Sequence, residues 1–110
     1  MLISDRLRHL IDGWEVPHAA VGVTDATSEL ALVGDAHWQT RIASVSKLLI
    51  TWAMLVAVEE GTVTLEEPAG PAGSTLRHLL AHASGLGFND GDPAGSVGAR
   101  RVYSNAGIEQ

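Results

Sequence analysis

Cysteine is absent from the 110 residues, and lysine occurs once, as Lys47. The lack of cysteine excludes disulfide bonds and any metal site built on thiolates. Basic side chains are few, because seven Lys and Arg stand against 13 Asp and Glu and leave a formal net charge of −6. This acidic balance argues against a general nucleic-acid binder or a protein that binds anionic membranes.

A secretion signal and a membrane span are also missing from the sequence. Residues 1–12 carry charges every few positions and lack the apolar core and small-residue cleavage site of a signal peptide. The apolar run Leu48–Val58 is interrupted by Thr51 and is too short to cross a bilayer. The sequence as written therefore predicts a cytoplasmic protein without a membrane partner.

The overall composition is typical of a folded chain, with 45% hydrophobic and 18% charged residues. A length of 110 residues fits one small domain and falls below the usual size of a complete two-domain enzyme. No internal repeat is visible.

The first third of the chain predicts a helix followed by a hairpin. Apolar residues recur at helical spacing from Leu2 to Trp14, and this helix is expected to end at Gly13. Strands are predicted at His18–Thr24 and Glu29–Val33, joined by a turn at residues 25–28. Such an order favours an α+β fold with a helix packed on one face of a sheet.

Two further helices are predicted downstream. Leu48–Val58 is apolar nearly all round, which indicates a helix buried on most sides. Ser74 is the expected N-cap of a short helix over residues 75–82. His78 and His82 have a spacing that could bind a metal, but no third ligand is evident. We therefore expect no metal site and no cofactor.

Ser44 precedes Lys47 by three residues, so a helix would place both side chains on one face. Such a pair can perform nucleophilic catalysis, in which the hydroxyl attacks and the amine takes its proton. The spacing alone has little specificity, because the chain contains eight serines. The alternative is a lysine whose stem covers the helix end while its ammonium group stays in water.

Three phrases resemble motifs of the serine β-lactamase and penicillin-binding-protein superfamily. Arg41–Lys47 is similar to its Ser-x-x-Lys nucleophile motif. Leu76–Leu86 resembles the His-Thr-Ser-Gly-Leu segment of the class C β-lactamase and esterase branch, with Ala83 in place of threonine. Tyr103-Ser-Asn105 resembles the Tyr-x-Asn motif of the same branch. The order and spacing agree with this superfamily over nearly all of the chain.

The resemblance implies a β-lactamase/transpeptidase-like fold, in which helices flank an antiparallel sheet and a helical subdomain is attached. Residues 1–62 would begin the α/β part, with the N-terminal helix, the hairpin and the nucleophile helix. Residues 63–110 would begin the helical subdomain, which carries the Tyr-x-Asn motif. Residues 106–110 contain no counterpart of the family's later Lys/His-Thr/Ser-Gly strand, so the chain is expected to be a truncated, N-terminal portion of the fold.

The resemblance also assigns roles to individual residues. Ser44 would be the acylated nucleophile, and Lys47 would help to deprotonate it. Tyr103 would be a second proton-transfer partner whose pKa is lowered by Lys47, while Asn105 would hydrogen-bond Lys47 or the amide of the substrate. Ser104 is expected to face away from the site. The implied substrate is a small-molecule ester, amide or β-lactam.

The leading hypothesis is therefore a serine acyl hydrolase, acting as an esterase or peptidase rather than as a dedicated β-lactamase. A truncated, non-catalytic relic or binding module that keeps only the N-terminal half of the fold is the alternative. A third possibility is that a partner or a second copy completes the sheet by strand addition. His82, Ser84 and Gly85 are expected to shape the turn that supports the cleft. The oligomeric state is left open.

Overall fold

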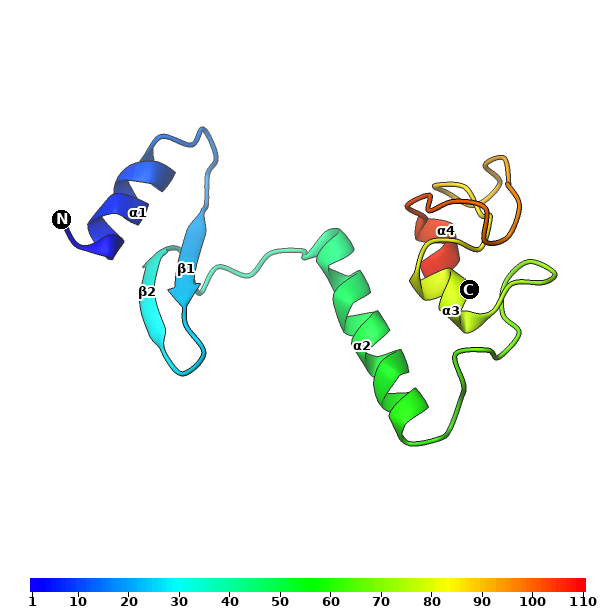
Figure 1. The fold of residues 1–110 in the computed structure, drawn as a ribbon. Coiled ribbons are helices and arrows are strands. Elements are labelled where there is room, and N and C mark those ends of the chain that lie inside the picture. The colour runs from blue at the N-terminus through cyan, green and yellow to red at the C-terminus, as the bar shows by residue number, and fades with distance from the viewer. The chain divides into compact units, whose positions relative to one another are not determined.

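A computed structural model describes residues 1–110, and the chain divides into two compact units, Met1–Arg41 and Ile42–Gln110. The elements are α1 (Ile3–Asp12), β1 (Ala20–Thr24), β2 (Glu29–Gly34), the 3₁₀ turn η1 (Ala43–Val45), α2 (Ser46–Glu59), α3 (Leu76–Leu80) and α4 (Asn105–Ile108) (Figure 1). None of the helices has the length and apolar character that crossing a bilayer requires. The predicted division at residues 62 and 63 concerns the fuller family fold and stays a prediction.

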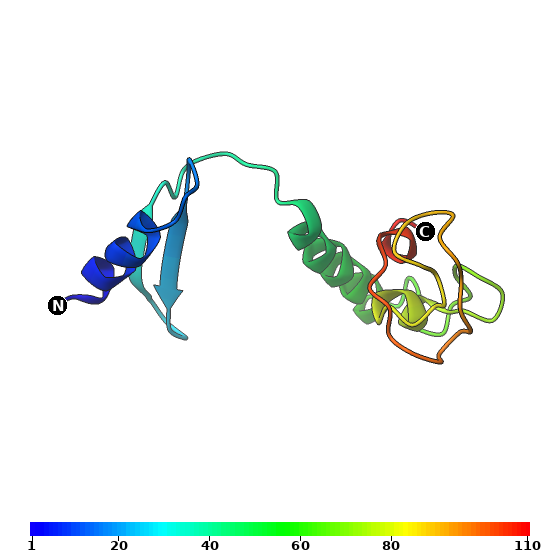
Figure 2. The same ribbon diagram turned by 90° about the horizontal axis from the view of Figure 1, so that it is seen from above.

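In the first unit, α1 lies along the antiparallel pair β1–β2, as Figures 1 and 2 both show. The small core consists of Ile11 from α1 with Ala31 and Val33 from β2, all of which are buried. Leu32 lies between these two strand residues and is exposed, because successive side chains of a strand point to opposite faces. The predicted helix and hairpin are confirmed, and they agree with an α+β fold.

The turn of the hairpin is organised by Asp25. Its Oδ1 accepts hydrogen bonds from the backbone N–H groups of Thr27 and Ser28, both at 2.8 Å. These two backbone bonds are the main reason that the pKa of Asp25 lies below its ordinary value. An aspartate that bonds its own turn in this way favours the reversal of the chain.

In the second unit, the prediction that the helix over Leu48–Val58 is buried on most sides is wrong, since none of the residues of α2 is buried. Leu48 and Trp52 are 71% and 69% exposed, although the helix is apolar nearly all round. The buried apolar residues of this unit, Leu76, Leu79 and Ala106, belong to α3 and α4. An apolar sequence shows that a helix is suited to burial, but burial also requires apolar partners. The apolar residues of α3 and α4 pack mainly against each other and do not cover α2.

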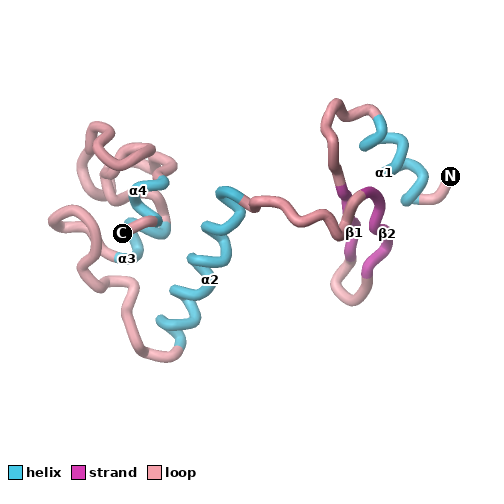
Figure 3. The backbone as a smooth tube through the Cα atoms, turned by 180° about the vertical axis from the view of Figure 1, so that it is seen from behind, coloured by secondary structure: helices cyan, strands magenta, loops and turns pink.

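The short helix α3 also differs from its prediction in both limits. Its N-cap is Thr75, whose backbone N–H donates to Nδ1 of His78 at 3.1 Å. Ser74, the predicted cap, is instead buried. The helix ends at Leu80 because His82 adopts a positive φ of 56°, which a continuing α-helix does not allow. Most of the chain between α2 and α4 is loop (Figure 3).

Candidate functional site

Ser44 is in the middle of η1, directly before α2. The residue before it, Ala43, has a φ of 44°, in the left-handed region that side chains other than glycine disfavour by about 1–2 kcal/mol. The turn is held from α2, because the Ser46 hydroxyl donates to the Ala43 carbonyl oxygen at 2.7 Å. Backbone strain of this kind is often found at functional sites, where the surroundings hold it.

Lys47 reaches back to Ser44, and its Nζ donates a hydrogen bond to Ser44 Oγ at 3.1 Å. The prediction that the two side chains share one face is therefore confirmed. Ser44 is exposed, so its hydroxyl is open to a ligand, while Lys47 is half-buried. A neutral lysine amine at this distance could accept the hydroxyl proton during attack on a carbonyl carbon.

Tyr103 comes to the same place from the other end of the second unit. Lys47 Nζ lies 5.1 Å from the centroid of its ring. Hydrogen bonding by the Ser44 hydroxyl, and next by Lys47, holds the pKa of the Tyr103 phenol below its ordinary value. Burial opposes these hydrogen bonds to a smaller extent, and the positive charges of Lys47 and Arg101 lower the pKa further. The structure thus brings the three predicted catalytic residues together.

These three side chains open onto a cavity of about 440 Å³. Its wall is mainly apolar on the α2 side, where Trp52 and Leu55 contribute, and Arg101 supplies a positive charge. A cavity of a few hundred Å³ with a few convergent polar groups is typical of a small-molecule site.

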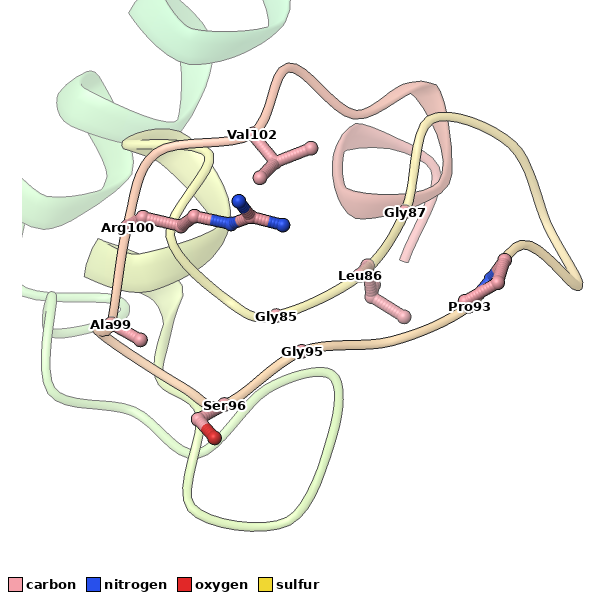
Figure 4. A pocket seen from close by; sticks show the side chains of 9 residues that line it. All are labelled: Gly85, Leu86, Gly87, Pro93, Gly95, Ser96, Ala99, Arg100 and Val102. Atoms are coloured by element: carbon pink, nitrogen blue, oxygen red, sulfur yellow. The ribbon is translucent and has the colours of Figure 1, made fainter.

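A smaller cavity of about 80 Å³ lies in the glycine-rich loop of the same unit. It forms where residues 85–87 face residues 93–102 (Figure 4), and the Gly95 N–H donates to the Gly85 carbonyl there. None of Ser44, Lys47 and Tyr103 lines this cavity, so the reaction site is assigned to the larger one.

Asn105 and Ser104 follow Tyr103 and have different surroundings. The Asn105 amide donates to Asn89 Oδ1 at 3.3 Å, and the expected bond between Asn105 and Lys47 is not present. Asn105 also does not line the 440 Å³ cavity, so its role in substrate binding stays a prediction. Ser104 is buried, and its Oγ donates to the Gly87 carbonyl at 2.6 Å, in agreement with its predicted structural role.

His82 lies next to the predicted catalytic residues, whereas the sequence predicted only that it shapes a supporting turn. It lines the 440 Å³ cavity, and its ring stacks on that of Tyr103 with 4.9 Å between centroids. Its Nδ1 accepts a hydrogen bond from the Ser104 N–H at 3.0 Å. Burial lowers the pKa of His82, and the positive charges of Arg101 and Lys47 lower it further. No local sequence signal could have found this role, because the left-handed conformation that ends α3 at His82 is visible only in the structure.

Comparison with known proteins gives one match. The family model described as Beta-lactamase matches residues 8–109, which is all of the chain except its first seven residues and the last one. No curated protein and no solved structure matches the chain.

Proposed function

Because the chain belongs to the β-lactamase family, as the match over residues 8–109 shows, we propose that it is a serine acyl hydrolase. The substrate is an ester or an amide, which includes a β-lactam, and Ser44 is the residue that becomes acylated. The observation that carries the proposal is the 3.1 Å hydrogen bond from Lys47 Nζ to Ser44 Oγ, beside the ring of Tyr103.

The proposed reaction has two steps. Ser44 Oγ attacks the carbonyl carbon, and its proton passes to the Lys47 amine or to the Tyr103 phenolate. The bond from the carbonyl carbon to the leaving oxygen or nitrogen then breaks, and that atom takes the proton. Water then attacks the acyl carbon and gives a proton to the same base, the bond from this carbon to Ser44 Oγ breaks, and Oγ takes up the proton. Proton transfer by a positioned side chain contributes about 10²- to 10⁴-fold in rate.

The lowered pKa of Tyr103 supports its part in this scheme. At a given pH below 10, a tyrosine with a lowered pKa has a larger phenolate fraction than an ordinary tyrosine. The phenolate is the form that accepts a proton. The Ser44 hydroxyl and Lys47 are the two groups that most favour this form, and in the proposed scheme Ser44 is also the group that gives up the proton.

The experiment that tests the proposal is covalent labelling with a fluorophosphonate, followed by intact mass measurement and peptide mapping. We expect one adduct, on Ser44, and none in Ser44→Ala. Ser96→Ala is the matched control, because Ser96 is exposed and does not line the 440 Å³ cavity. Labelling that persists in Ser44→Ala would contradict the proposal, and reversible ester binding without any adduct would favour a non-catalytic binding module.

A further inference from the structure

The turn after α3 contains a histidine where its geometry favours glycine. The Ala83 N–H donates to the His78 carbonyl at 2.7 Å, and the His82 N–H donates to the Leu79 carbonyl at 3.1 Å. These two bonds define a Schellman end, whose left-handed residue is usually glycine. Here that residue is His82, with a φ of 56°. Because strained backbone conformations are often found at functional sites, this one suggests that the His82 side chain has a functional role.

The contacts of His82 lie on both sides of Tyr103. Its carbonyl oxygen accepts the Val102 N–H at 2.8 Å, and its Nδ1 accepts the Ser104 N–H at 3.0 Å. Its ring stacks on the Tyr103 ring with an interplanar angle of 26°. The two neighbours of Tyr103 in the chain are therefore both tied to one residue, which also supports the face of the phenol ring.

We propose that His82 is a positioning residue for Tyr103, and that the hydrogen bond from the Ser104 N–H to His82 Nδ1 holds the phenol oxygen against Ser44 and Lys47. The inference rests on the proposed function, in which Tyr103 exchanges a proton with Ser44. It requires the neutral imidazole with its proton on Nε2, since a proton on Nδ1 would face the Ser104 N–H. The burial of His82 and the charges of Arg101 and Lys47 favour that neutral form.

Two substitutions separate positioning from folding. His82→Gly suits the left-handed turn and is expected to fold at least as well as the parent chain, but it removes the acceptor. His82→Asn also tolerates this conformation and can present its Oδ1 near the place of Nδ1. We expect the labelling rate of Ser44 to fall about 10- to 100-fold in His82→Gly, because small misplacements of catalytic groups have effects of this size. His82→Asn should recover most of that loss.

A spectroscopic signal reports on Tyr103 without any reaction. Tyr103 is the only tyrosine in the chain, so the near-ultraviolet absorbance of tyrosinate during a pH titration belongs to one residue. In His82→Gly we expect the titration to move up towards the ordinary value of about 10, because Tyr103 loses its placement against Ser44 and Lys47. In His82→Asn it should stay near that of the parent chain.

The outcomes separate this inference from the proposed function. An unmoved Tyr103 titration in a folded His82→Gly variant overturns the positioning role, and so does a His82→Asn variant that behaves like His82→Gly. A titration that shifts as expected in a chain whose Ser44 is never labelled supports the positioning role and contradicts the hydrolase. Imidazole nitrogen NMR of the parent chain adds a test that needs no variant, since a proton on Nδ1 of His82 would overturn the proposal.

Discussion

At the scale of single residues, two of the three side chains at the site occur only once in the chain. Lys47 is its only lysine and Tyr103 its only tyrosine, and the two lie beside the same serine hydroxyl. The Ser44 hydroxyl accepts a hydrogen bond from Lys47, and it is also the main group that lowers the pKa of the Tyr103 phenol. The nucleophile therefore has two candidate proton acceptors.

The first prediction concerns the pH dependence of labelling at Ser44. Tyr103 has a pKa below its ordinary value of about 10, so its phenolate form increases as the pH rises towards that value. We expect the labelling rate to rise with pH through this ionisation. In Tyr103→Phe the rate should be about 10²- to 10⁴-fold lower at the plateau, because one positioned proton acceptor is lost.

The measurement is the rate of fluorophosphonate labelling across the pH range in which the fold persists. The same profile for Ser96→Ala, a serine outside the 440 Å³ cavity, serves as the control and should keep the rise. An identical rise in Tyr103→Phe would show that another group titrates.

The sequence predicted part of this site for a simple geometric reason. Residues three apart on a helix share a face, so the contact between Ser44 and Lys47 follows from spacing alone. Tyr103 contacts them across a long loop, and only the motif resemblance indicated that. The partners of Asn105 and His82 depend on where residues 85–102 run, and no local pattern determines that path.

At the scale of elements, the junction of η1 and α2 positions the nucleophile. Ala43 is left-handed at this junction, with a φ of 44°, and Ser44 follows it directly. Ser46 ties the junction to the first turn of α2 through the Ala43 carbonyl. The orientation of Ser44 therefore depends on one strained residue and one short hydrogen bond.

The second prediction tests this junction. Ala43→Gly should raise the free energy of unfolding by up to about 1 kcal/mol, since relief of the left-handed strain exceeds the added flexibility of the unfolded chain. Ala43→Val should lower it, because a β-branched side chain tolerates a positive φ poorly. Urea unfolding measures both changes. A Gly variant less stable than the parent would contradict this account.

The elements differ in how accurately their limits could be predicted from the sequence. The hairpin was predicted because its turn is specified locally by Asp25 and its hydrogen bonds to the next residues. The limits of α3 were not, since two adjacent residues, Ser74 and Thr75, are both good caps. The choice of Thr75 depends on its bonds to His78, and the end of the helix depends on His82.

At the scale of the whole molecule, each unit has its own small core. Ile11, Ala31 and Val33 form one, while Leu76, Leu79 and Ala106 form the other. The long helix α2 belongs to neither core, and most of its large apolar side chains are exposed. The exposed apolar side chains of α2 form a continuous patch, in contrast to the single exposed apolar residues that are common on protein surfaces.

The third prediction follows from that surface. We expect the protein to bind an amphiphilic dye such as anilinonaphthalene sulfonate and to enhance its fluorescence. Leu49→Glu should reduce the signal, because Leu49 is 57% exposed on α2 and does not line the 440 Å³ cavity. Thr62→Glu, which adds the same charge in the exposed loop after α2, should leave the signal unchanged. Equal fluorescence in all three proteins would rule out α2 as the binding surface.

The single lysine also decides which reagents can be used on this protein. An amine-directed reagent finds only two amines, the N-terminal one and Nζ of Lys47, and the second is hydrogen-bonded to the nucleophile. Attaching a dye, a surface or a crosslinker through lysine would therefore remove the proposed base of the reaction. Cyanate that accumulates in old urea solutions would carbamylate the same nitrogen. Protein refolded from such solutions would therefore be inactive, because the carbamylated nitrogen can no longer accept the proton.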